Sequence, residues 1–360
     1  MISVNHTFLP PKEELLAYID QIWDGGVFTI NGGLIREFEE QLKKYLGVKH
    51  LLLVSNGTMA LQLALRAIAK PGGEVLTTPF SFIATSSSIL WEGLKPVFSD
   101  IDPDSLCLDP NQLEAKITEN TCAILPTHVF GNVCDIEAID KIAAKYKLPV
   151  IYDGAHAFGS TWQGKSVFRY GDVSCLSLQA YKILQMVEGG ALITENNALA
   201  ETFSKLRTFG KSLDNEIETI GINAKSSEIH AAIGLCNLKE IDSIFSARKE
   251  IGQEYDRLLQ GLPMQKPQVA LGASFNYSYY PILLKNEQTL LKLKAVLFAE
   301  GVKARRYFHP SLNRLDFMPD QSPMPISESA ASRVLCLPIY KGLKMEEVRK
   351  IGGIIQQELG

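Results

Sequence analysis

One lysine, Lys182, lies between two strand-like apolar runs in the segment SCLSLQAYKILQMVEGGALIT, residues 174–194. The first run covers residues 173–178 and the second covers residues 191–194. A lysine on such a connection is most often an exposed surface residue. A lysine held in a pocket instead has a depressed amine pKa and can form a Schiff base with an aldehyde. This segment alone leaves both interpretations open.

An aspartate and a histidine follow another apolar strand, in the segment PVIYDGAHAFG. Asp153 stands at the carboxyl end of that strand, where open α/β sheets bind ligands, and His156 follows three residues later. Taken singly, Asp153 could cap the next loop, and a lone histidine is more often structural. Pyridoxal phosphate chemistry needs an aspartate of this kind and a lysine such as Lys182, about thirty residues further on. The carboxylate keeps the pyridine nitrogen protonated, and the lysine carries the aldehyde.

Two further motifs offer groups for the phosphate and the ring of such a cofactor. In SNGTMALQLAL, Gly57 and Thr58 lie between a strand and a helix, where backbone N–H groups and a hydroxyl can face an anion. An ordinary helix N-cap explains the same residues equally well. Ser177 could add a second hydroxyl, and Phe82 in PFSFIAT could stack on the ring or belong to the core.

The segment GSTWQGKS, residues 159–166, matches the G-x-x-x-x-G-K-[ST] phosphate-loop pattern letter for letter. That loop works only when a strand precedes it and a helix begins at the lysine. The residues after Ser166, VFRYGD, have no helical periodicity. We therefore predict a hairpin loop here and regard the nucleotide-hydrolysing alternative as the weakest.

The composition of the chain excludes several classes of partner. Its 360 residues carry a net charge of −4 and a pI of about 5.9, so we expect no nucleic-acid partner. The first twenty residues lack a secretion signal and no run is long enough to span a bilayer, so we expect no membrane partner. Six scattered cysteines without a C-x-x-C pair indicate reduced thiols and a cytoplasmic protein, with no metal site.

The periodicity of the chain predicts an α/β fold with two domains. Strands alternate with helices up to about residue 225, which is typical of a mainly parallel sheet with helices on both faces. Beyond it, one or two long helices and a smaller mixed segment follow. We expect a large α/β domain at 1–240 and a small C-terminal α+β domain at 241–360. The expected helices lie at 34–47, 55–70, 81–93, 113–118, 136–147, 226–262, 289–301 and 344–359. The expected strands lie at 50–54, 74–79, 95–101, 148–155, 276–284 and 302–308, and a strand followed by a loop is expected at 122–131.

Taken in order, these motifs resemble the DegT/StrS-type sugar-nucleotide aminotransferases, a family of fold-type I pyridoxal phosphate enzymes. The resemblance covers nearly the whole chain. It is carried by NGGLIREFE, SNGTMALQLAL, TTPFSFIAT, PVFSDID, YDGAHAFG, LSLQAYKILQMVEGGALIT, GINAKSSEIHAAIGL and RRYFHP. It implies a homodimer whose active sites are completed across the interface.

The resemblance also implies roles for individual residues. Lys182 would be the Schiff-base lysine, and Asp153 would pair with the pyridinium. The other residues implied to bind the cofactor are Gly57, Thr58, Phe82, His156 and Ser177, together with Asn223 and Lys225, which would reach the site of the second subunit. The residues implied to bind the substrate are Asn31, Arg305, Arg306, Tyr307 and His309; the basic segment 303–310 could equally be an edge strand whose cations prevent aggregation.

The resemblance narrows the expected reaction to amino transfer. The family's lysine segment usually reads close to SFHATK, and this chain has SLQAYK, with Gln179 and Tyr181 replacing a histidine and a threonine. A related group that dehydrates sugars has histidine at the position of Lys182, so a lysine here indicates amino transfer. We expect L-glutamate as donor and a dTDP-linked 4-keto-6-deoxy sugar as acceptor, in a pathway to surface polysaccharide such as lipopolysaccharide O-antigen. The alternatives are a 3-keto sugar acceptor and a non-catalytic sugar-nucleotide-binding regulator of the same fold.

Overall fold

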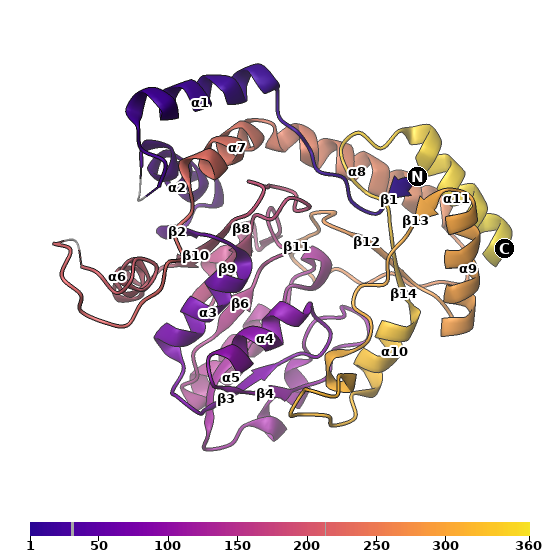
Figure 1. The fold of residues 1–360 in the computed structure, drawn as a ribbon. Coiled ribbons are helices and arrows are strands. Elements are labelled where there is room, and N and C mark those ends of the chain that lie inside the picture. Colours follow the sequence, from indigo (N-terminus) through magenta and orange to yellow (C-terminus); the bar gives the residue numbers. More distant parts are fainter. Residues whose placement is uncertain (30–31, 213) are drawn as a thin grey trace.

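The computed structural model describes residues 1–29, 32–212 and 214–360 of the chain (Figure 1). Its helices are α1 (Lys12–Gly25), α2 (Gly33–Leu46), α3 (Gly57–Ile68), α4 (Ile83–Trp91), α5 (Ile136–Tyr146), α6 (Asn197–Leu206), α7 (Glu228–Lys239), α8 (Ile241–Leu258), α9 (Glu287–Ala299), α10 (Pro325–Arg333) and α11 (Met345–Leu359). Its strands are β1 (Ile2–Ser3), β2 (His50–Val54), β3 (Glu74–Thr77), β4 (Lys95–Phe98), β5 (Thr121–Leu125), β6 (Ile151–Asp153), β7 (Thr161–Trp162), β8 (Lys165–Ser166), β9 (Val173–Ser177), β10 (Gly190–Thr194), β11 (Ala273–Ser274), β12 (Tyr280–Leu283), β13 (Val302–Lys303) and β14 (Val334–Leu337).

A mixed sheet of mainly parallel strands forms the centre of the larger part of the chain. Its two halves have the orders β4-β3-β5 and β6-β9-β10-β2. Isolated parallel bridges, Ile124↔Val150 and Thr127↔Asp153, join β5 to β6 and make the sheet continuous. Only β10 runs against its neighbours. The carboxyl ends of β2, β5, β6 and β9 therefore meet at one edge of the sheet.

Alternate residues of each strand face opposite sides of this sheet and build two separate cores. In β2, Leu51 and Leu53 pack into the core that contains residues of α2, α5 and α7. Leu52 and Val54 pack into the other core, with residues of α3, α4 and α6. Both faces of the sheet are thus covered by helices, as the alternation of strands and helices predicted, and the α/β fold class is confirmed.

The C-terminal part of the chain has a core of its own. Residues of α8, α9, α11, β12 and β14 form this cluster, and Figure 1 shows α9, α10 and α11 (orange to yellow) around β12 and β14. The N-terminal residues join this part, because β1 pairs in parallel with β13. The long helical segment contains two helices that meet near residue 240; the domain boundary placed there stays a prediction.

Several expected elements are shorter than the sequence indicated, among them the helix at 113–118 and the strands at 148–155 and 302–308. The expected helix at 113–118 is a single 3₁₀ turn, Glu114–Lys116, because the segment is too short for a ladder of α-helical bonds and Ile117 is extended. The expected strand at 302–308 ends at Lys303, and Arg305 then bridges Cys336 of β14. The hairpin expected at residues 159–166 is confirmed, since β7 and β8 pair antiparallel there.

Candidate active site

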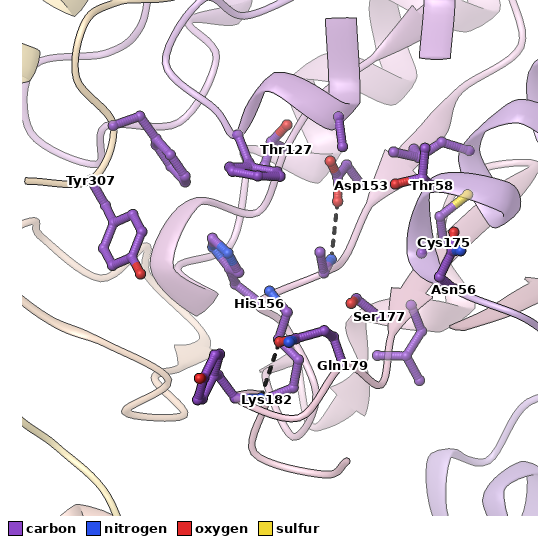
Figure 2. Close-up of a pocket in the computed structure, with 18 of the residues that line it drawn as sticks. Asn56, Thr58, Thr127, Asp153, His156, Cys175, Ser177, Gln179, Lys182 and Tyr307 are labelled. Atoms are coloured by element: carbon purple, nitrogen blue, oxygen red, sulfur yellow. Dashed lines mark hydrogen bonds between the residues drawn. The ribbon is translucent and has the colours of Figure 1, made fainter. Parts of the chain in front are cut away.

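The carboxyl edge of the sheet opens into a cavity of about 490 Å³ (Figure 2). The C-terminal part of the chain closes its far side through residues of the segment 305–308. Of the sequence-predicted residues, the cavity brings together Gly57, Thr58, Phe82, Asp153, His156, Ser177, Lys182, Arg305 and Tyr307. Residues far apart in the sequence thus share one site because the strand ends that carry them share one edge.

Lys182 lies on the connection between the antiparallel strands β9 and β10. A tight turn holds it, in which the Lys182 backbone N–H donates to the Gln179 carbonyl at 2.8 Å. Burial lowers the pKa of the Lys182 amine to about 8, and the charge of Asp153 opposes this effect. A substantial fraction of this amine is therefore neutral, and so nucleophilic, near pH 8.

Asp153 ends β6 and is 5% exposed. The Thr85 hydroxyl donates to its Oδ2 at 2.7 Å, and the Ala155 backbone N–H donates to its Oδ1 at 3.0 Å. Burial raises the pKa of the Asp153 carboxyl, while the two hydrogen bonds and the Lys182 amine lower it. On balance the pKa of Asp153 is raised, and the structure provides a buried carboxyl group that two hydrogen bonds hold in the cavity containing Lys182.

His156 and Phe82 line the same cavity, His156 as a buried residue and Phe82 as an exposed one. The Phe130 backbone N–H donates to His156 Nδ1 at 3.3 Å, so the other ring nitrogen is the one left for a ligand. Burial, and next the charge of Lys182, hold the pKa of His156 well below its usual value. His156 is therefore a neutral imidazole at neutral pH. Phe82 is 58% exposed, and its ring lines the cavity instead of filling the core.

The amino end of α3 offers a site for an anion. Gly57 and Thr58 begin the helix, and the Asn56 side chain caps it by accepting from Met59 N at 2.8 Å. Ser177, at the end of β9, lies so close that a Cβ on Gly57 would be 2.9 Å from the Ser177 Cβ. Only glycine fits there without displacing the serine. The close approach places the backbone N–H groups at the start of α3 near the hydroxyls of Thr58 and Ser177, where an anion could bind.

The basic segment of the C-terminal part borders two cavities, and its Arg305 and Tyr307 line both. Arg305 and Tyr307 line the main cavity, and Arg305 Nη1 donates to Tyr307 Oη at 2.9 Å. Arg306 is instead bound to Glu287 at 2.6 Å and to the carbonyl of Ser332 at 3.2 Å. Arg306 and His309 line a second cavity beside α9 and are absent from the lining of the main one.

Three other predicted residues lie outside the main cavity or outside the described residues. Asn223 and Lys225 line a separate pocket of about 200 Å³ with Ser55 and His230, and Lys225 Nζ donates to Asn223 Oδ1 at 2.8 Å. Their predicted role concerns the second subunit's site and stays a prediction. Asn31 lies outside the residues that the structure describes.

The structure adds residues to the site that the sequence analysis did not single out. Thr85 was missed although it belongs to the same motif as Phe82; it lies in the first turn of α4, where its hydroxyl donates to Asp153. Thr127 and Tyr279 also line the cavity, as does Asn5, which lies two residues after β1. No local signal marks these three, because only the pairing of distant segments brings them there.

Among the described residues, no cluster suited to hold a metal ion occurs and no helix is long and apolar enough to cross a membrane.

Known proteins resemble this chain over nearly its whole length. The profile of the DegT/DnrJ/EryC1/StrS aminotransferase family matches residues 11–356. The dTDP-4-amino-4,6-dideoxy-D-glucose transaminase of Shigella dysenteriae is 39% identical over 367 residues, which cover 99% of this chain and 98% of that protein. The structure of DesI in the presence of its TDP-sugar product has a TM-score of 0.93 at 31% identity, covering 99% of this chain and 92% of that one. An aminotransferase from Brucella abortus has a TM-score of 0.90 at 31% identity, covering 97% and 96%.

Proposed function

Because the chain belongs to the DegT/DnrJ/EryC1/StrS aminotransferase family, we propose that it transfers the amino group of L-glutamate to a nucleotide-linked keto sugar with pyridoxal phosphate as cofactor. The observation that carries this proposal is the meeting of Lys182 and Asp153 in one cavity, each affecting the protonation of the other. A protein that only binds sugar nucleotides has no need of this pair, which speaks against the regulator alternative.

The residues of the cavity fit pyridoxal phosphate in three places. The amino end of α3, with Thr58 and Ser177, suits a phosphate, because backbone N–H groups, two hydroxyls and the helix dipole favour an anion there. The Asp153 carboxylate suits a protonated ring nitrogen, and Phe82 suits the face of an aromatic ring. When bound, the cofactor supplies an aldehyde for the lysine and an electron sink for the carbon that loses its proton.

Three side chains of this protein manage the protons of the reaction. Lys182 provides the amine, and its pKa of about 8 allows that one nitrogen to accept and return a proton near neutral pH. Asp153 holds a proton on the ring nitrogen, and Thr85 fixes the carboxylate in place by its hydrogen bond. His156 enters as a neutral imidazole, so it can exchange a hydrogen bond with a ring substituent without bringing a charge.

The proposed acceptor is a 4-keto-6-deoxy sugar on a dTDP carrier. The similarity to a dTDP-4-amino-4,6-dideoxy-D-glucose transaminase along 99% of the chain supports this substrate class. Arg305, at the mouth of the cavity, has no carboxylate partner among the described residues, so its charge is available for the diphosphate. Arg306 is already paired with Glu287, so its contribution to substrate binding would be to orient the segment that carries Arg305.

We further propose that the enzyme works as a homodimer in the cytoplasm and supplies an amino sugar for surface polysaccharide such as lipopolysaccharide O-antigen. The pocket of Asn223 and Lys225 supports the dimer. These two polar residues do not line the main cavity of their own subunit, so they are free to contribute to the site of a second subunit. Exposed apolar side chains, Ile217 at 74% and Ile220 at 84%, lie on the loop that precedes this pocket and suit a subunit interface. The six buried free thiols suit a reducing compartment.

The proposed reaction can be tested with the purified protein. Incubation with pyridoxal phosphate, L-glutamate and dTDP-4-keto-6-deoxyglucose should yield a dTDP-linked 4-amino sugar, located by NMR, and Lys182→Ala should yield none. An isomeric 3-keto sugar serves as the second substrate. Amination of the 3-keto sugar alone would favour the 3-aminotransferase alternative, and bound cofactor without conversion of either sugar would favour the regulator.

A further inference from the structure

Thr127 carries a buried hydroxyl without a hydrogen-bond partner among the described residues. The residue is 4% exposed, and it lines the main cavity. Its position is fixed by the fold, since its carbonyl accepts from the Cys134 thiol at 3.1 Å and its two neighbours, Pro126 and His128, bond to the backbone of Asp153. Buried hydroxyls in folded proteins almost always have partners. An unpartnered hydroxyl at the wall of a binding cavity therefore points to a partner on the ligand.

The position of Thr127 indicates which part of the ligand this is. Thr127 and Asp153 are directly paired residues on neighbouring parallel segments, so their side chains lie on the same face of the sheet, about one strand spacing of 4.8 Å apart. Figure 2 shows both at the same end of the cavity. The two oxygens of Asp153 already accept from Thr85 and Ala155, and no bond joins them to Thr127. The hydroxyl is thus free to contact whatever lies beside the group that Asp153 holds.

We propose that the Thr127 hydroxyl is a positioning group for the cofactor and donates a hydrogen bond to the phenolic oxygen of its pyridine ring. This inference rests on the proposed function, in which Asp153 holds the ring nitrogen. The phenolic oxygen is the polar ring substituent nearest to that nitrogen, and the aldehyde and phosphate lie further away. His156, the residue predicted for the ring hydroxyl, then shares this oxygen with Thr127. The bond makes the oxygen a weaker acceptor for the proton that it shares with the lysine-linked nitrogen.

The same substitution at two buried threonines separates this role from a purely structural one. Thr77 is also a buried threonine at a strand end of the sheet, but its hydroxyl donates to the Leu125 carbonyl at 2.8 Å and it does not line the cavity. Thr77→Val should lower the thermal midpoint of the cofactor-free protein by about 2 °C or more and leave cofactor affinity unchanged. Thr127→Val removes an unpaired hydroxyl, so the cofactor-free protein should be as stable as the wild type or more stable.

The decisive experiment is titration of both variants and Thr127→Ser with pyridoxal phosphate, followed by absorbance. We expect Thr127→Val to bind about tenfold more weakly than wild type and to show a raised pKa of the bound chromophore. Thr127→Ser, which keeps the hydroxyl, should restore both properties. Equal affinity and an unchanged chromophore pKa in Thr127→Val would overturn the inference, as would a loss of stability in its cofactor-free form. If the wild-type protein itself bound no cofactor, the proposed function would fail instead.

Discussion

The depressed pKa of Lys182 makes a quantitative prediction about pH. The value of about 8, against an ordinary 10.5, means that burial disfavours the protonated amine by about 3 kcal/mol. At pH 8 about half of Lys182 is neutral, whereas about one in 300 of ordinary lysines is. The rate at which cofactor-free protein combines with pyridoxal phosphate should therefore rise with pH and level off above a midpoint near pH 8.

Substitution of Asp153 tests the cause of this shift. The charge of Asp153 raises the pKa of Lys182 against the effect of burial, so Asp153→Asn should move the midpoint below pH 8. The rate is followed by stopped-flow absorbance of the new band between pH 6.5 and 10, with Lys182→Ala as the blank. A wild-type midpoint near pH 10 would show that Lys182 has an ordinary amine pKa, and an upward shift in Asp153→Asn would show that Asp153 does not raise it.

The same pKa sets the pH dependence of stability. Because the folded pKa of Lys182 lies below its unfolded value, the protonated amine destabilises the cofactor-free fold below about pH 8. This penalty is relieved as pH rises from about 8 to about 10.5, where both states have lost the proton. The free energy of unfolding of wild type relative to Lys182→Met, measured by urea denaturation, should therefore increase across that window. A flat difference would show that the amine is not buried in the folded state.

Three further predictions concern the groups around the lysine. Thr85→Val removes a hydrogen bond to a carboxylate, worth about 1.5–3 kcal/mol; the pKa of Asp153 should rise and kcat should fall tenfold or more, and unchanged kinetics would contradict the role of Thr85. Arg305→Ala should raise KM for the nucleotide sugar at least tenfold with little effect on the KM for L-glutamate, and the reverse pattern would assign Arg305 to the amino donor. Finally, Lys182→Ala and Lys225→Ala proteins, each inactive, should regain up to about a quarter of wild-type activity when they are unfolded and refolded together, because one site of the mixed dimer is intact; no recovery would contradict shared sites.

Much of the site was predictable because its motifs stand at strand ends. The apolar runs before Asp153 and Ser177 fix where their strands stop, and parallel strands bring those ends to one edge. The glycine at position 57 marks a close approach that only a glycine permits. These features can be recognised in short segments of the sequence. The parallel sheet then brings the residues that they mark together in one site.

The remaining residues depend on contacts that no local pattern encodes. Thr127 is adjacent to Asp153 only because the segment after β5 bridges to β6, and Asn5 reaches the cavity only because β1 pairs with β13, some 300 residues away. The strand predicted at 302–308 was wrong beyond Lys303, because the strand ends there although the apolar and polar residues go on alternating. Likewise, the pairing of Arg306 with Glu287 of α9 could not be foreseen from two adjacent arginines.

The lysine that bears the cofactor can be identified directly by trapping its link to the protein. The protein is loaded with pyridoxal phosphate, reduced with borohydride to fix the link, digested and analysed by mass spectrometry. We expect a phosphopyridoxyl group on Lys182 alone, with none in Lys182→Ala. The group on a different lysine, or its absence from reduced wild-type protein that had bound the cofactor, would contradict it.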